Sequence, residues 1–236
     1  KPHHYEVLVR FDGDKSPYEL IKFAESMHLV HEMDLAICES VIQWFQRGEG
    51  VGGAIVAVNL SAQSLQNDIF VASLLDLVRR NSRYANRLAF EITESSELSN
   101  IEATNRVLQE LRELGHEICL DDFGAGFASF QYLHGLHVDW VKFDGRYIRS
   151  VLEVPRDRVL LKAMANLCRE LQIRTVGEQV ETESQAGLLT DLGVGYAQGW
   201  LFGKPALEPR LPQAETPREP ARPVNVRRQG TRDSWG

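Results

Sequence analysis

Short apolar runs recur from residue 4 to residue 205, and stretches with apolar residues at helical spacing separate them. Several runs are almost continuous in Val, Ile, Leu and Ala, which is typical of parallel strands that are buried on both faces. The pattern predicts seven strands, at residues 4–10, 54–61, 87–94, 116–123, 138–144, 173–180 and 195–202.

The intervals between these runs predict helices, near residues 17–27, 31–47, 68–81, 99–115, 156–171 and 181–191. In the clearest of them, Ser99 and Glu102 match a capping box, and Gly115 supplies a left-handed stop. Alternating strands and helices indicate a parallel sheet with right-handed crossovers. A barrel and an open, doubly wound sheet both fit. The absence of a G-x-G-x-x-G or P-loop pattern after the first strands disfavours the open sheet.

The composition changes at about residue 208. Residues 208–236 are rich in Pro and Arg and poor in apolar residues, so they cannot bury enough surface to offset the entropy of ordering. We therefore expect one folded domain at residues 1–207 and a disordered tail at 208–236.

Composition also narrows the class of protein. A net charge of −7 argues against a general nucleic-acid binder, so no DNA partner is expected. The three cysteines are isolated in the sequence, which disfavours a disulfide scaffold or a zinc site and fits the cytoplasm. No apolar run reaches the ~18–20 residues of a membrane span, and no signal peptide is expected.

Polar residues recur at or just after the ends of the predicted strands. In a barrel these ends meet on one face, where the active sites of such folds lie. Charged groups there are costly unless they are paired or bind a metal, and oxygen ligands suit Mg²⁺ or Mn²⁺. A pair of such ions is a standard device for phosphodiester cleavage. The residues concerned are Glu6, Asn59, Glu91, Glu94, Asp121, Asp122, Lys142, Asp144, Glu178, Glu181 and Gln198.

Seven motifs carry a family resemblance when they are taken together, in this order and spacing. They are EVLVR (6–10), VNLS (58–61), FEITES (90–95), LDDFGAGFAS (120–129), VKFD (141–144), VGEQVET (176–182) and AQGWLFGKP (197–205). Over residues 4–205 the chain resembles the EAL domain family of cyclic di-GMP phosphodiesterases and their receptor relatives. The resemblance implies an α/β fold, a modified TIM-type (β/α)8 barrel. The first strand of the family barrel is missing from this chain, so seven strands are expected.

The resemblance also implies roles for single residues. Two ions, Mg²⁺ or Mn²⁺, would be held by Glu6, Asn59, Glu91 and Asp121 and by Asp121, Asp122 and Glu178, with Asp121 shared. Lys142 would orient the attacking water, and Glu178 would help to take its proton. Water would then attack one phosphodiester in line, giving linear pGpG.

Four further residues have supporting roles in the family. Arg10 would contact a phosphate, Gln198 would line the site, Glu94 would hold the loop after Asp122, and Glu181 would support the metal ligands. The resemblance also implies a homodimer and allows upstream sensory or GGDEF domains outside this chain.

Some positions depart from the family pattern. Val7 replaces Ala, and Gly177 and Gln179 flank Glu178 where Ala and Gly are usual. The loop after Asp122 has Ala125, Phe127 and Ala128 in place of hydroxyl residues and a Tyr.

We expect an active phosphodiesterase. The altered loop and Gln179 also allow a cyclic di-GMP receptor without activity, and a barrel without a nucleotide site is a third interpretation. His3 and His4 could serve as metal ligands, but we expect them to be exposed to solvent near the start of the chain. We expect His116, His134 and His137 at the surface.

Overall fold

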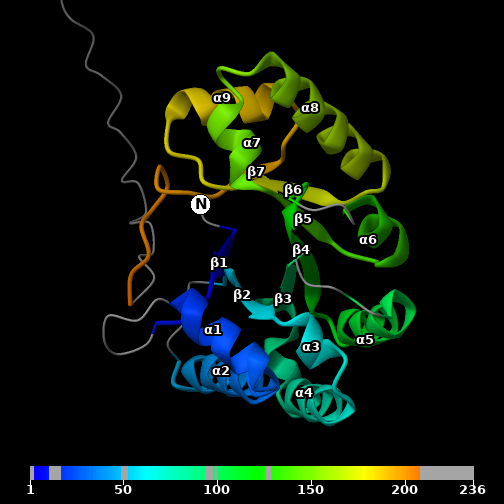
Figure 1. Ribbon diagram of the computed structural model, residues 1–236. Helices are drawn as coiled ribbons and strands as arrows, with labels where there is room; N and C mark the ends of the chain where they lie inside the picture. Colours follow the sequence, from blue (N-terminus) through cyan, green and yellow to red (C-terminus); the bar gives the residue numbers. More distant parts are fainter. Residues whose placement is uncertain are drawn as a thin grey trace, which may run out of the picture.

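The computed structural model describes residues 3–10, 17–48, 53–93, 98, 100–125 and 129–207. Seven parallel strands form one sheet in which the strand order follows the sequence. The sheet curls into a half-barrel with the helices around its outside (Figure 1), which confirms the predicted fold class. Each predicted run contains one strand: β1 (His4–Glu6), β2 (Ile55–Leu60), β3 (Leu88–Thr93), β4 (Glu117–Phe123), β5 (Trp140–Phe143), β6 (Arg174–Gly177) and β7 (Tyr196–Ala197).

Every connection between consecutive strands up to β7 contains at least one helix. The helices are α1 (Pro17–Ser26), α2 (Val30–Gln46), α3 (Ala62–Leu65), α4 (Asp68–Arg80), the 3-10 helix η1 (Ser82–Arg87), α5 (Ile101–Glu113), α6 (Ser129–Gly135), α7 (Gly145–Ser150), α8 (Pro155–Glu170) and α9 (Glu183–Asp191). Within the described ranges, none of them has both the length and the hydropathy needed to cross a bilayer. The predicted tail at 208–236 lies outside the described residues, so this boundary stays a prediction.

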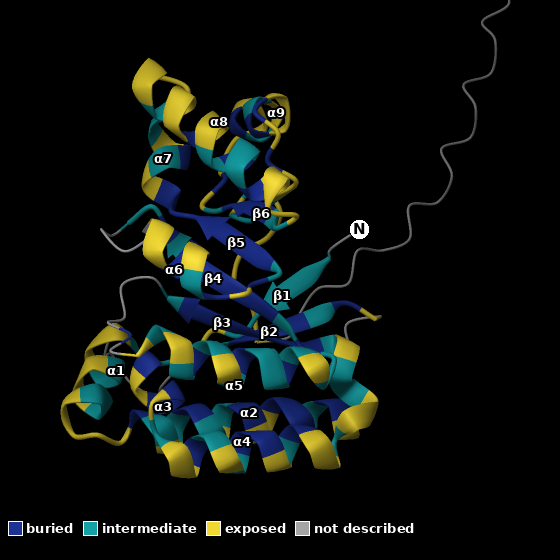
Figure 2. Ribbon diagram, turned by 90° about the vertical axis from the view of Figure 1, so that its right-hand side faces the viewer, coloured by how far each residue is buried: buried dark blue, intermediate teal, exposed yellow. Residues whose placement is uncertain are grey.

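Alternation along the strands divides the apolar residues between two cores. Residues such as Val58, Phe90 and Leu120 face outward and belong to the large core beneath the helices, where the strands are buried (Figure 2). Cys119, Trp140 and Val176 form a separate cluster on the concave side. The apolar runs are nearly continuous because both faces of the sheet are covered.

The curl brings the two ends of the sheet together through side chains. The ring of His3 lies 5.0 Å from that of Tyr196 in β7 and 4.8 Å from that of Trp140 in β5. Trp140 also donates a hydrogen bond to Glu117, at 2.6 Å. These side chains fill the concave side near the N-terminal ends of the strands, below the level of the predicted polar residues.

Two local predictions were wrong. Helix α5 begins at Ile101, and its cap is Asn100, whose side chain accepts a hydrogen bond from the Ala103 N–H at 2.9 Å. The cap thus lies one residue after the predicted Ser99, which is outside the described residues. His116 is buried, not at the surface, because the turn into β4 places its Nδ1 2.9 Å from the Leu88 carbonyl oxygen.

A buried carboxylate holds the turn that follows β2. Asp34, in α2, accepts hydrogen bonds from the Ser61 N–H at 2.8 Å and from the Ser64 hydroxyl at 2.7 Å. Ser61 is itself the cap of α3. Because Ser61 lies two residues after Asn59, Asp34 fixes the end of the strand that presents Asn59 to the concave side.

Burial raises the pKa of Asp34 to about 6, although the bonds from Ser61 and Ser64 oppose the shift. The folded protein therefore holds this proton more tightly than the unfolded chain does. The contribution of Asp34 to the free energy of unfolding should fall by about 3 kcal/mol as the pH rises from about 4 to about 6, and then stay constant.

Asp34→Asn should remove this fall while keeping an acceptor for Ser61. Urea unfolding of both proteins at several pH values measures the difference. Glu39→Gln, an exposed change on the same helix, is the control and should follow the wild type. Parallel pH profiles for Asp34→Asn and the wild type would contradict the expectation.

Candidate metal centre

Lys142 lies in the middle of β5, and only 1% of its side chain is exposed. Its ammonium nitrogen contacts four carboxylates: Glu178 at 2.9 Å, Glu91 at 3.0 Å, Asp121 at 3.2 Å and Glu6 at 3.3 Å. They come from β1, β3, β4 and the end of β6. Burying a lysine is costly unless it is paired, so the ammonium and the carboxylates depend on one another.

The strand register explains why these side chains converge. Asn59 in β2 is the direct register partner of Glu91 in β3, so both side chains leave the sheet on the same face. Thr93, two residues after Glu91 in β3, is in turn the register partner of Asp121 in β4. Since residues two apart share a face, Glu91 and Asp121 both point to the concave side.

Asp122 reaches the same rim through an irregularity in β4. The β4–β5 register shifts between Leu120 and Phe123, and Asp122 adopts a φ of +56°. Its N–H donates to the Asp121 carboxylate at 2.9 Å. A bulge of this kind re-aims a side chain that regular alternation would send to the other face.

Glu6 is held by amide groups as well as by Lys142. Asn59 Nδ2 donates to one carboxylate oxygen at 3.1 Å, and Gln198 Nε2 donates to the other at 2.9 Å. Gln198 Oε1 in turn lies 3.3 Å from His4 Nε2. His4 was expected at the surface and is instead half-buried beside the site. Its position two residues before Glu6, on the same strand face, was the signal that sequence reasoning missed.

Burial and crowding shift the pKa values of the carboxylates. Burial raises the pKa of Glu91 to about 8 and that of Glu178 to about 7, and Lys142 offsets only part of each shift. Burial, followed by the charge of Asp121, raises the pKa of Asp122 to about 6. Burial would also raise the pKa of Glu6, but Lys142 and the amide hydrogen bonds outweigh it and lower the pKa.

The carboxylates form two overlapping sets that could each hold a metal ion. Glu6, Glu91 and Asp121 form one set, and Asp121, Asp122 and Glu178 form the other. In each set, one oxygen from every residue lies within 4.8 Å of the others. The donors are all oxygen, which fits hard cations. Five carboxylates and one ammonium would carry a formal charge of minus four, which two divalent cations would balance.

The structure does not bring every predicted site residue into this cluster. Arg10 is exposed after β1, and its guanidinium donates to the Val9 carbonyl at 2.9 Å. Glu181 is exposed, and its N–H donates to Gln185. Glu94 lies outside the described residues, as do Phe127 and Ala128. The roles predicted for Arg10, Glu94 and Glu181 stay predictions.

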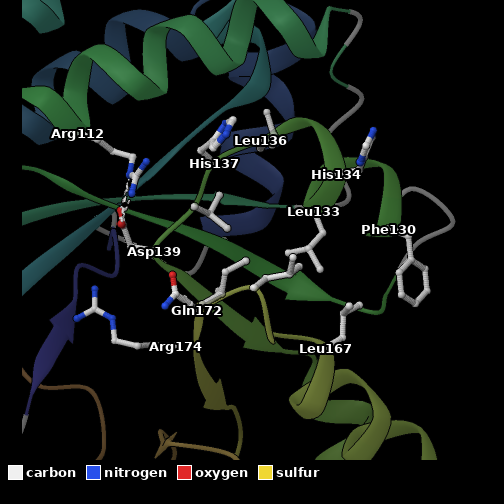
Figure 3. A pocket seen from close by; sticks show the side chains of 13 residues that line it. Arg112, Phe130, Leu133, His134, Leu136, His137, Asp139, Leu167, Gln172 and Arg174 are labelled. Atoms are coloured by element: carbon white, nitrogen blue, oxygen red, sulfur yellow. Dashed lines mark hydrogen bonds and ion pairs between the residues drawn. The ribbon is translucent and has the colours of Figure 1, made fainter. Parts of the chain in front are cut away.

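A separate groove of about 680 Å³ lies between α6 and α8, at the N-terminal ends of β5 and β6 (Figure 3). Its floor is apolar, and its arginines are paired, Arg112 with Asp139 at 2.8 Å and Arg174 with Glu117 at 2.6 Å. It shares no residue with the carboxylate cluster, so we place the chemistry at the cluster.

Comparisons with known proteins agree with this geometry. The EAL domain family model matches residues 1–205. The cyclic di-GMP phosphodiesterase PdeF of Escherichia coli (strain K12) is 32% identical over 207 residues, covering 86% of this chain and 28% of PdeF. The chain spans 24–33% of the length of the curated relatives it matches.

Two solved structures are also similar. The PaMucR phosphodiesterase in complex with c-di-GMP is 30% identical with a TM-score of 0.73, over 85% of this chain and 83% of that one. Klebsiella pneumoniae BlrP1, in a manganese/cy-diGMP complex, is 26% identical with a TM-score of 0.74, over 86% of this chain and 52% of that one.

Lys142→Met tests whether the ammonium holds the carboxylates together. Without divalent cations, we expect the free energy of unfolding to fall by about 3–5 kcal/mol, because the buried carboxylates lose their counter-charge. The loss should shrink in acid, where the carboxylates are protonated.

Urea unfolding in EDTA at several pH values measures this loss. Lys162→Met, an exposed change on α8, should cost less than about 0.5 kcal/mol. An equally small effect of both substitutions would mean that Lys142 does not stabilise the cluster.

Proposed function

The chain belongs to the EAL domain family, and we propose that it is a phosphodiesterase that hydrolyses cyclic di-GMP to linear pGpG with two divalent cations, Mg²⁺ or Mn²⁺. One observation carries this proposal: two carboxylate sets share Asp121 and surround Lys142. Paired cation sites of this kind are a recurring solution for in-line phosphodiester cleavage.

Each set has a defined membership in the proposal. Glu6, Glu91 and Asp121, with the amide of Asn59 beside them, would hold one cation, and Asp121, Asp122 and Glu178 would hold the other. When bound, such cations stabilise charge on the phosphoryl oxygens and make a water more acidic. The manganese and cyclic di-GMP in the BlrP1 complex, and the c-di-GMP bound to PaMucR, support this choice of metal and ligand.

The remaining groups position the water and the substrate. Lys142 would orient the attacking water, and Glu178, 2.9 Å from the lysine nitrogen, would be within reach of its proton. Gln198 keeps Glu6 in place through the 2.9 Å hydrogen bond. Arg10, at the exposed rim, would bind a phosphate, while Glu94 and Glu181 would support the loops that carry the ligands.

The proposal also covers the setting of the domain. The matched relatives are much longer than this chain, and PdeF and PaMucR are phosphodiesterases by name. The family resemblance suggests a cytoplasmic homodimer under the control of sensory or GGDEF domains.

A second candidate function is a cyclic di-GMP receptor without turnover. The observation that favours it is the sequence change beside Glu178, where Gln179 adopts a φ of +54° in place of the usual glycine. A shift of the neighbouring carboxylate could abolish turnover and still leave ligand binding intact.

Incubating the purified protein with cyclic di-GMP and Mn²⁺, followed by chromatography, decides between these functions. We expect linear pGpG, no product in EDTA, and recovery when Mn²⁺ is restored. Glu91→Gln should lower kcat by about 100-fold or more, because it removes a buried anionic ligand. Glu113→Gln, an exposed change at the end of α5, should leave kcat unchanged.

The other outcomes separate the alternatives. Binding of cyclic di-GMP without product in Mn²⁺ or Mg²⁺ would replace the enzyme with the receptor. Absence of both binding and product would leave only a barrel without a nucleotide site.

A further inference from the structure

Gln179 directly follows Glu178 and has a left-handed backbone, with a φ of +54°. Its neighbours are both fixed by the sheet. The Glu178 N–H donates to the Phe143 carbonyl at 3.3 Å, and the Val180 N–H donates to the Gln198 carbonyl at 3.0 Å. The left-handed residue between them turns the chain, so that Glu178 faces Lys142 while Val180 is fully buried.

The side chain of Gln179 lies across the first turn of α7. A Cβ built on Gly145 would lie 2.2 Å from Gln179 Cδ and 2.6 Å from its Cγ. Gln179 thus occupies the space that any larger residue at position 145 would need. Its Oε1 also accepts a hydrogen bond from Arg149, one turn further along α7. Two contacts therefore tie Gln179 to this helix.

Helix α7 is itself anchored to the other ligand-bearing segments. Asp144, two residues after Lys142, caps α7 and accepts a hydrogen bond from the Arg146 N–H at 2.6 Å. The Tyr147 hydroxyl donates to the Gly124 carbonyl at 3.2 Å, two residues after Asp122. The ends of β4, β5 and β6 therefore meet on one short helix.

We propose that Gln179 is a positioning residue that clamps the Glu178 segment to α7 and so sets the affinity for the cation held by Asp121, Asp122 and Glu178. Its effect on catalysis rests on the proposed function, whereas its effect on cation affinity does not. The clamp replaces a flexible glycine by a side chain that is fitted to Gly145. On this view the departure from the family pattern orders the site.

The clamp predicts an interaction between two substitutions. Gly145→Ala should push the Gln179 side chain away and weaken Mn²⁺ binding about tenfold, the loss typical for a group that supports a metal ligand. Gln179→Gly should weaken it about threefold, as expected for an exposed hydrogen bond and its packing. In the Gln179→Gly background, Gly145→Ala should have no further effect, because nothing is left for the new Cβ to displace.

Calorimetric titration of the four proteins with Mn²⁺ alone measures these affinities, and melting temperatures are recorded in parallel. Gln179→Asn tolerates the left-handed backbone and is too short to reach Arg149, so it should match Gln179→Gly. Turnover assays should show a lower kcat with an unchanged KM in the same variants. Loss of Mn²⁺ affinity without a lower melting temperature would separate positioning from general destabilisation.

Two results would overturn the proposal. One is an Mn²⁺ affinity of Gln179→Gly that equals that of the wild type. The other is a loss of Mn²⁺ affinity on Gly145→Ala that is as large in the Gln179→Gly background as in the wild type. If Gly145→Ala does not fold, Arg149→Met replaces it. Arg149→Met should weaken Mn²⁺ binding in the wild type but not in the Gln179→Gly background. Arg156→Met, an exposed change on α8, should not weaken Mn²⁺ binding in either background. A wild type that binds Mn²⁺ but gives no pGpG refutes the proposed function, and the titrations still test Gln179.

Discussion

The ammonium of Lys142 sits between carboxylates that come from four different strand ends, and the concave side of the half-barrel is organised around this contact. An unpaired lysine at this depth would cost several kcal/mol, and so would the carboxylates without it. The sheet must therefore curl until all of these groups meet. Burial, together with the neighbouring carboxylates, raises the pKa values of Glu91 and Glu178, and the excess of carboxylates over the one ammonium suits divalent cations.

Long-range features of this arrangement could be predicted from the sequence, because they follow from alternation. Strands buried on both faces leave nearly continuous apolar runs, and acids spaced by two residues share a face. Local geometry was harder to predict. Helices α3 and α7 are too short to show a period, and the bulge at Asp122 has no signature in composition. Several polar residues precede α5, so the predicted cap, Ser99, was one residue too early, and Asn100 is the cap.

Three residues show how tertiary context overrides sequence expectation. His116 and His4 belong to a type that is often exposed, but the start of β4 buries His116 and the concave face of β1 leaves His4 only half-exposed. Gly177 stands where the family usually has alanine, and a Cβ there would lie 2.7 Å from Leu189 Cδ1. The missing methyl group lets α9 pack closely on β6. The departures around Glu178 are thus matched to their neighbours, as Gln179 is to Gly145.

The hydrogen bonds of Gln198 join positions at opposite ends of the domain, 192 residues apart for Glu6 and 194 for His4. Closing contacts of such high sequence separation costs more chain entropy than closing local ones, so we expect them to form late in folding. During synthesis, a nascent chain that stops short of Gln198 has the carboxylates of the earlier strands but not the amide that fixes Glu6. The arrangement around Glu6 therefore reaches its final form only after nearly the entire domain has left the ribosome.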